Sequence, residues 1–157
     1  MLEKLWHWLY GNFAPHCNAR GLALIQASEG LRLFRYKDTN GAYKIGYGSP
    51  ADGYPSMITA ADASLLLLKT LRPIEKAIHR AVKVPLTSDQ FSALCSFAYN
   101  VGIENLLKST LLKELNKGDY AAAAEWFCSW DHVNGRISLG ITERRWKERC
   151  LFLSQKP

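Results

Sequence analysis

The segment from residue 29 to residue 48, EGLRLFRYKDTNGAYKIGYG, restricts the fold of this chain more than any other. Asn40-Gly41 interrupts its alternating pattern and predicts a tight β-hairpin, because a type I′ turn needs positive φ at both central residues. Apolar residues at helical spacing just before it predict a helix over residues 19–29. We therefore expect a helix that leads directly into a small sheet-containing lobe over residues 31–58.

The rest of the chain favours a mainly helical lobe. Thr59-Ala-Ala-Asp62 and Thr87-Ser-Asp-Gln90 have the pattern of capping boxes, which open helices. The first of these helices, about residues 65–82, contains Pro73, which should kink or break it. Further helices are expected from Thr87 to about Gly102 and over residues 109–116, 120–130 and 142–153, with a loop around Asn134-Gly135 and Gly140. The fold class predicted is α+β, a small β-hairpin lobe joined by a long helix to a mainly helical lobe.

At 157 residues the chain is long enough for one domain with a substantial core. We expect residues 1–18 to be an N-terminal leader helix and residues 19–157 to be a single domain. The apolar residues of the leader fall at helical spacing, which favours an extra helix packed on the domain over an interfacial membrane helix. There is no conventional signal peptide and no apolar run of about eighteen residues, so neither export by that route nor a membrane-spanning helix is predicted.

The net charge of +6 favours an anionic partner. No helix-turn-helix, zinc or RNP-like pattern supports nucleic acid as that partner. The four cysteines are scattered without a CxxC pair, so no metal site is expected, and their redox state is left open. We expect two of these cysteines and two tryptophans to be core residues: Cys95, Cys128, Trp126 and Trp130.

Two carboxylates, Glu29 and Asp38, flank the start of the predicted hairpin. Cleavage of a glycosidic bond requires two carboxyls in unlike environments on either side of a groove. Two acidic residues nine positions apart are common, however, and two solvated surface carboxylates are the simpler interpretation of the spacing alone. The residues around Glu29 and Asp38 have to decide between a catalytic pair and two surface carboxylates.

Those residues resemble the active-site segment of the phage-type, T4-like lysozymes of the endolysin family. The resemblance lies in Glu29-Gly30, in Asp38 nine positions later, and in Ile45-Gly46-Tyr47-Gly48. It continues through the second half of the chain in the segments SFAYNVG at 96–102, STLL at 109–112, LNKGDY at 115–120 and GITERR at 140–145. It covers about residues 20–153 and implies a lysozyme-like fold, with a muramidase activity that needs neither cofactor nor metal.

The resemblance also implies roles. Glu29 would be the general acid that protonates the leaving oxygen of the β-1,4 bond between N-acetylmuramic acid and N-acetylglucosamine. Asp38 would support the attacking water or the developing positive charge, and because the family is inverting, a water should fit between the two carboxyls. Tyr47, Gly48 and Asn100 are candidate substrate-binding residues. Hairpin packing for Tyr47 and helix termination for Asn100 are the structural alternatives.

Two points concern charges around this site. Arg144 or Arg145 could pair with Glu29 and hold it in place, although a solvated basic face with pairs such as Glu143–Lys147 is an equally simple interpretation. Lys44 stands where the family carries a Thr that helps to hold the nucleophilic water. A lysine supplies donors only, so it cannot reproduce the geometry of a hydroxyl, and we expect it to impair hydrolysis.

The predicted function is an endolysin that hydrolyses bacterial peptidoglycan and lyses the host, acting as a monomer without stable membrane insertion. It would accumulate in the host cytoplasm and reach the wall at lysis. The alternative is a lysozyme-like protein that binds peptidoglycan without hydrolysing it. A toxin or effector domain with the same fold, and a nucleic-acid binder, are less favoured by the sequence.

Overall fold

The structure, a computed structural model, describes residues 15–154. The part of the predicted leader helix over residues 1–14 lies outside this range, and residues 15–18 are not helical, because Asn18 is the extended N-cap of α2. The helices and strands are α2 (Ala19–Glu29), β1 (Arg32–Lys37), β2 (Tyr43–Gly46), β3 (Ser49–Pro50), α3 (Ala60–Ala81), α4 (Ser88–Val101), α5 (Ile103–Lys108), α6 (Thr110–Asn116), α7 (Tyr120–Glu125), β4 (His132–Val133), β5 (Arg136–Ile137) and α8 (Leu139–Leu153). Among the described helices, none has the length and apolar character needed to cross a bilayer.

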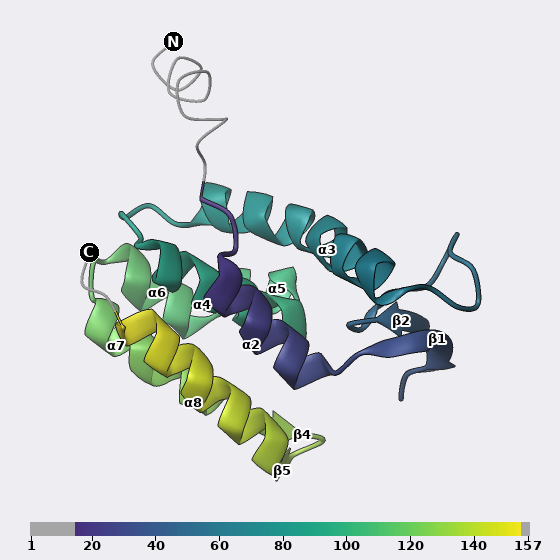
Figure 1. Ribbon diagram of the computed structural model, residues 1–157. Helices are drawn as coiled ribbons and strands as arrows, with labels where there is room; N and C mark the ends of the chain where they lie inside the picture. Colours follow the sequence, from purple (N-terminus) through teal and green to yellow (C-terminus); the bar gives the residue numbers. More distant parts are fainter. Residues whose placement is uncertain (1–14, 155–157) are drawn as a thin grey trace.

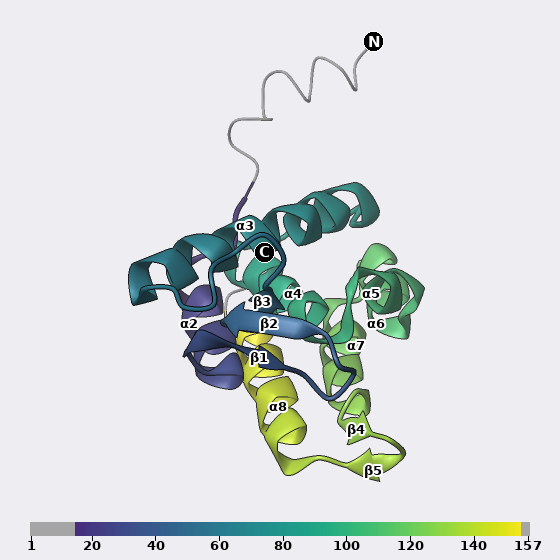
Figure 2. The same cartoon turned by 90° about the vertical axis from the view of Figure 1, so that its right-hand side faces the viewer.

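A three-stranded antiparallel sheet, in the order β1-β2-β3, forms the small lobe, and the other lobe is helical apart from the short β4-β5 hairpin. The long helix α3 runs along one edge and α8 along the opposite edge in both views (Figures 1 and 2). Between them lies α4, in which every residue from 89 to 98 is buried. The predicted α+β fold, with a sheet lobe joined by a long helix to a helical lobe, is confirmed.

Two hydrophobic clusters hold these lobes. The larger one surrounds α4, and the smaller one lies between the sheet and the start of α3 and consists of Ile45, Ala51, Ile58, Ala63 and Leu66. Full burial of a large apolar side chain contributes roughly 1.5–3 kcal/mol. The half-buried ring of Tyr47 packs against both clusters, so it ties the sheet to the helical lobe.

The local signals for helix ends are confirmed. Both capping boxes form, at Thr59–Asp62 and at Thr87–Gln90, with the side chain and the backbone exchanging hydrogen bonds in each. Gly102 follows α4 with φ of 91°, a conformation that suits glycine. These motifs depend on hydrogen bonds within four residues, which is why they can be read from the sequence.

Four helix predictions are corrected. α3 is one unbroken helix from Ala60 to Ala81 that passes through Pro73, because the buried face on both sides of the proline packs on α4 and outweighs one lost backbone hydrogen bond. α5 was not predicted. The helix expected over 120–130 is α7 followed by a 3-10 turn at Trp126–Ser129. The last helix begins at Leu139, three residues early, and includes Gly140.

The predicted hairpin at Asn40-Gly41 forms, but its type I′ turn is wrong. Only Gly41 has positive φ (83°), and its N–H donates to the carbonyl of Asp38 at 3.0 Å. The Asp38 side chain accepts from the N–H groups of Asn40 and Ala42, both at 2.9 Å, and so imposes a different turn. Positive φ at both positions occurs instead at Asn134 (50°) and Gly135 (76°), between β4 and β5, where a loop was expected.

The core predictions are half right. Cys95 is fully buried, and Trp130 packs edge-on against Phe97 with 5.6 Å between ring centroids. Cys128 and Trp126 are exposed, because the 3-10 turn rotates them away from the face that a continuous helix would have buried. The four cysteines are all free thiols.

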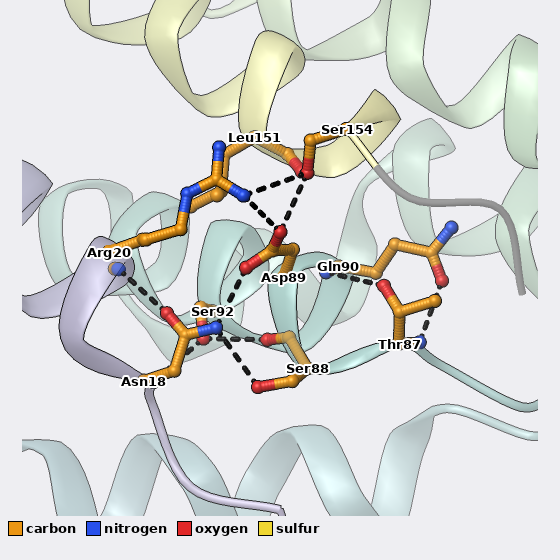
Figure 3. Close-up of polar contacts among 10 residues, drawn as sticks. Asn18, Arg20, Thr87, Ser88, Asp89, Gln90, Ser92, Leu151 and Ser154 are labelled. Atoms are coloured by element: carbon orange, nitrogen blue, oxygen red, sulfur yellow. Dashed lines mark hydrogen bonds and ion pairs between the residues drawn. The ribbon is translucent and has the colours of Figure 1, made fainter.

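The start of α2 is fixed by a buried carboxylate on α4. Asp89, 2% exposed, accepts hydrogen bonds from Asn18 (2.8 Å) and Ser154 (2.8 Å) and pairs with Arg20, which joins the beginnings of α2 and α4 to the end of α8 (Figure 3). Burial tends to raise the pKa of Asp89, but hydrogen bonds from Ser154 and Asn18 and the charge of Arg20 outweigh it and lower the pKa. α2 therefore enters the domain in a fixed position.

Candidate active site

Glu29 is the last residue of α2 and lies where the helix meets the sheet lobe. Gly30, with φ of 71°, turns the chain sharply into β1. The Glu29 side chain is 23% exposed, and its Oε1 accepts a hydrogen bond from Nη1 of Arg144 on α8 at 2.6 Å. The chain thus places a largely enclosed carboxylate at the junction of the two lobes.

Arg144 is itself held inside the helical lobe. Its Nε donates to Oε1 of Glu148 at 3.1 Å and its Nη2 donates to the carbonyl of Ser96 at 3.0 Å. Glu148 is fully buried and also accepts from the Ser96 hydroxyl (2.7 Å) and from Arg145. The guanidinium that holds Glu29 therefore has all three of its nitrogens bonded, in a network that removes it from water.

Arg145, the neighbouring residue, does not reach Glu29. It bonds to the carbonyl of Trp130 at 3.0 Å and to Oδ1 of Asn100, and burial lowers its pKa while Glu148 opposes the shift. The exposed pair Glu143–Lys147 also forms, at 2.6 Å. The buried face of α8 thus supplies the arginine that pairs with Glu29, and its exposed face carries the solvated ion pair that was the alternative interpretation.

Backbone approaches Glu29 closely from the sheet side. A Cβ built on Gly48 would lie 3.2 Å from Oε2 of Glu29 and 4.0 Å from the hydroxyl of Tyr36, and Gly48 has φ of 77°. A side chain at this position would be strained and would crowd the carboxylate. Gly48 is thus required by geometry beside Glu29, whether or not it binds substrate.

Tyr36 is a site residue that the sequence analysis missed. Burial raises the pKa of its phenol, and the charges of Glu29 and Asp38 raise it further, against the lowering influence of Arg32. The Arg32 guanidinium lies 4.5 Å from the Tyr36 ring centroid. The sequence offered only one signal for it, the position of Tyr36 two residues before Asp38 in the expected hairpin. A protonated phenol thus lies within the influence of both carboxylates.

Asp38 follows the end of β1 and is anchored by its own turn. Its Oδ1 accepts the two backbone N–H groups described above, while Oδ2 has no hydrogen bond from any residue in the range 15–154. Glu29 shows the same division, because Oε1 bonds to Arg144 and Oε2 has no protein donor within that range. Each carboxylate therefore has one anchored oxygen and one oxygen available to another group.

Lys44 lies directly across the ladder from Tyr36, the two Cα atoms being register partners on β2 and β1. Opposite residues in an antiparallel pair project to the same face of the sheet. The Lys44 side chain is half-buried, and its ammonium group forms no hydrogen bond or ion pair with the rest of residues 15–154. An unpaired ammonium group thus shares a sheet face with Tyr36.

The other predicted site residues occupy different positions. The backbone carbonyl of Tyr47 accepts from the hydroxyl of Tyr99 at 2.7 Å, which also lies 3.3 Å from Ser49 Oγ, and burial raises the pKa of Tyr99 to about 12. Asn100 is at the end of α4, exposed, and bonded to Arg145.

Asn100 also borders an open hollow of about 390 Å³ on the helical lobe. The hollow is lined by Asn100, Val101, Asn105, Ser129, Trp130, His132, Val133 and Ile141. Within residues 15–154 no three His, Cys, Asp or Glu side chains gather as metal ligands would.

A helix-end carboxylate held by a buried arginine and a second carboxylate in the turn after β1 both influence the Tyr36 phenol. Comparisons with known proteins identify the family of the chain. The Phage lysozyme family profile matches residues 26–148. The endolysin of Acyrthosiphon pisum secondary endosymbiont phage 1 is 37% identical over 144 residues, covering 88% of this chain and 99% of that protein. The endolysin of Bacillus phage B103 is 40% identical over 85% of this chain, which spans 52% of that protein.

Among solved structures, the muramidase domain of SpmX from Asticaccaulis excentricus superposes with a TM-score of 0.82 at 35% identity, covering 90% of this chain and 99% of that one. The chain belongs to the phage lysozyme family. It is accordingly an enzyme of the lysozyme class, a glycoside hydrolase, as the sequence predicted.

Proposed function

We propose that Glu29 and Asp38 together hydrolyse the β-1,4 bond between N-acetylmuramic acid and N-acetylglucosamine, so that the chain acts as a peptidoglycan-cleaving endolysin. This assignment rests on one observation: in each carboxylate, one oxygen is held by protein hydrogen bonds and the other is available to substrate or water. A reacting carboxyl has to be held in orientation without losing the oxygen that reacts. Both side chains meet that condition.

Glu29 is the general acid in this proposal. Its Oε1 is fixed by Arg144, so that a proton on Oε2 can be directed at the glycosidic oxygen of a sugar lying beside Gly48. Proton transfer from a positioned side chain contributes roughly 10²–10⁴-fold to the rate. Because Arg144 is immobilised by Glu148 and Ser96, the direction of Oε2 is fixed before substrate binds.

Asp38 and Tyr36 act on the opposite side of the sugar. The available Oδ2 of Asp38 accepts a proton from the attacking water or stabilises the positive charge that develops on the ring. Tyr36 stays protonated because its pKa is raised, so its hydroxyl can donate to a neighbouring oxygen. These roles support inversion at the anomeric carbon, with water entering between the carboxyls.

Lys44 lowers the rate in this proposal. Its ammonium group shares the sheet face with Tyr36, supplies no acceptor for water, and repels the positive charge that builds up on the sugar. Two unit charges about 4 Å apart at an effective dielectric near 20 interact by up to ~4 kcal/mol, which equals roughly a thousandfold in rate. The loss relative to a threonine at this position can therefore reach that size.

The test is release of reducing ends from purified peptidoglycan by this protein, Lys44→Thr and Glu29→Gln. Glu29→Gln should lose nearly all activity and Lys44→Thr should gain. Lys37→Thr is the matched control, because it removes a positive charge from the same hairpin. Lys37 follows Tyr36 on β1 and therefore projects to the opposite face of the sheet from Lys44. Its Nζ lies 5.3 Å from the centroid of the Tyr43 ring. It should leave the rate unchanged.

The outcomes separate the proposals. Equal rates for this protein and Lys44→Thr, with Glu29→Gln inactive, would retain the roles of the carboxylates and reject the effect of Lys44. Binding to the wall by all variants without any release of reducing ends would instead indicate a non-hydrolytic binding protein.

The same proposal covers partner and location. The substrate would be bacterial peptidoglycan, reached from the host cytoplasm when the membrane is breached at lysis, and the enzyme would work as a monomer. Size-exclusion chromatography with light scattering, and fractionation of expressing cells before and after membrane permeabilisation, test these two points.

A further inference from the structure

The outward face of α3 carries a row of cations. Lys69, Arg72, Lys76 and Arg80 are all exposed, and we call them the α3 stripe. At 100° per residue, their directions fall within about 80° of one another, and they extend over roughly 16 Å of helix. The face centred on Leu67, Leu71 and Ile78 is buried against α4 and lies on the opposite side of the helix. The α3 stripe therefore points directly away from the core.

The charge of the α3 stripe is not neutralised by the protein. Within residues 15–154 none of the four side chains forms an ion pair, although Lys69 donates a hydrogen bond to the neutral Tyr54 hydroxyl at 2.9 Å. The only acidic residues of α3 are Asp62, which caps the helix roughly 10 Å before Lys69, and Glu75, which is buried and bonded to His16. By contrast, Lys147 on α8 and Lys117, directly after α6, each have a carboxylate partner.

Position separates the α3 stripe from the active site. α3 and α8 lie at opposite edges of the molecule in both views, and Glu29 is bonded to α8 (Figures 1 and 2). A flat anionic surface that met the α3 stripe would therefore leave Glu29 uncovered. The four charges of the α3 stripe thus lie on a face that is separate from Glu29.

Apolar residues lie beside the α3 stripe and also occur in the sequence that precedes the described domain. Leu65 (66% exposed) and Leu68 (44% exposed) lie at its N-terminal end. At the other end, the chain enters the domain against α3, since the Pro15 carbonyl oxygen lies 2.9 Å from Nε2 of His79. The fourteen residues before Pro15 include Leu2, Leu5, Trp6, Trp8, Leu9 and Phe13, the residue types found at membrane interfaces.

We propose that the α3 stripe docks the enzyme on the surface of a bilayer that contains anionic phospholipid. Cations in a row bind a plane of phosphate headgroups, while the neighbouring leucines and the aromatic N-terminal segment favour a lipid surface over a hydrophilic polyanion. Each lysine or arginine near such a surface raises the partition coefficient roughly fivefold. Four of them together give roughly 600-fold, nearly three orders of magnitude, falling as salt screens the headgroups.

The experiment measures co-sedimentation of the full chain with vesicles of phosphatidylcholine alone or of phosphatidylcholine mixed with phosphatidylglycerol. We expect binding only to the mixed vesicles, weakening as ionic strength rises. The stripe variant K69Q/R72Q/K76Q/R80Q should lose at least tenfold in partition coefficient. Glutamine is a good helix former, so the variant should keep its Tm.

The matched control is K108Q/K117Q/R136Q/K147Q, which removes the same charge from exposed positions on other elements. It should bind the mixed vesicles nearly as well as the unchanged chain. Equal loss in both variants would overturn the proposal, since net charge alone would then explain binding. No loss in the stripe variant, with binding abolished by W6S/W8S, would overturn it too, because the N-terminal segment would then be the anchor.

Inorganic polyphosphate is the competing probe. If the chain bound polyphosphate through the α3 stripe but did not bind the mixed vesicles, the surface would be a site for an anionic polymer and the proposal would be wrong. Hydrolysis of purified peptidoglycan, which contains no bilayer, should be the same for the stripe variant, the control and the unchanged chain.

Discussion

The two carboxylates of the site are held in opposite ways. Glu29 is bonded to a residue 115 positions away in the sequence, and that arginine is in turn fixed by Glu148 and Ser96 inside the helical lobe. The Asp38 carboxylate accepts hydrogen bonds only from backbone N–H groups two and four residues away, in an exposed turn. The orientation of Glu29 thus depends on the packing of the whole domain, whereas that of Asp38 depends on one hairpin.

This contrast has a functional consequence. A general acid has to point at one oxygen atom, and a buried network supplies that precision. In the proposed mechanism the second carboxylate acts through a water molecule or by charge, a role for which anchoring by one turn is sufficient. If this is correct, changes around Glu29 should affect stability and activity together, and changes around Asp38 should affect activity alone.

The largest effect on stability is expected from Glu148→Gln. It replaces the charged carboxylate shared by two buried guanidinium groups, Arg144 and Arg145, with one neutral amide oxygen. Breaking a buried ion pair from one side costs roughly 3–5 kcal/mol, or about 10 °C in Tm for a chain of this size. Thermal unfolding measures it.

The matched control for Glu148→Gln is on the same helix. Glu143→Gln removes the carboxylate of an exposed pair with Lys147 and should leave Tm unchanged. A loss of stability of similar size in both variants would show that the network is no more important than a surface pair, and the contrast between the two carboxylates would lose its basis.

Asp38→Asn should separate activity from stability. The amide oxygen can still accept the N–H groups of Asn40 and Ala42, so the free energy of unfolding should fall by less than about 1 kcal/mol. The rate of peptidoglycan cleavage should fall by about a hundredfold, because the neutral amide neither accepts a proton nor stabilises positive charge. Parallel measurements of Tm and reducing-end release decide the matter. An unfolding penalty as large as that of Glu148→Gln would contradict local anchoring.

Asp89, which anchors the start of α2 far from Glu29, predicts a pH dependence. Its pKa is lowered in the folded state, so the stabilisation it provides is fully present above the unfolded pKa of about 4 and is lost as the pH falls through the lower folded pKa. At pH 7 Asp89→Asn should cost roughly 1.5–3 kcal/mol, since hydrogen bonds to a charged acceptor are lost. The difference from the unchanged protein should narrow below about pH 4.

Urea unfolding at neutral pH and near pH 3 measures this difference. Asp52→Asn is the control, because Asp52 is exposed in a loop and forms no hydrogen bond or ion pair within residues 15–154. Its effect should be small at both pH values. A penalty for Asp89→Asn that stayed constant on acidification would mean that its carboxylate charge contributes nothing to stability.

The sequence predicted what depends on neighbouring residues and missed what depends on packing. Both capping boxes, the bounds of α2 and the two-lobe order were predictable, because hydrogen bonds and periodicity within a few residues determine them. The partner of Glu29 was narrowed to Arg144 or Arg145, but the choice depends on the rotation of α8, whose start at Leu139 was not predicted. Tyr36 was missed because its importance arises only when Glu29 and Gly48 are brought beside it.

The two Asn-Gly pairs show how one side chain overrides a local signal. Asp38 lies two residues before Asn40 and captures the turn's N–H groups, so Asn40 keeps negative φ. The residue two before Asn134 is His132, which provides no such acceptor there, and the type I′ turn forms. The Asn-Gly dipeptide is the same in both places, and the residue two positions before it determines the type of turn.

This explanation yields the smallest of the predicted effects. Asn134→Ala places an alanine at φ of 50°, which costs about 1 kcal/mol, and should speed amide exchange in the β4–β5 hairpin roughly fivefold. Asn40→Ala should leave exchange in the β1–β2 hairpin unchanged, because the backbone N–H that bonds to Asp38 is retained and φ is negative. Equal effects in the two hairpins would mean that Asn40 still contributes as a turn residue. Asp38 would then act on substrate without determining the turn that carries it.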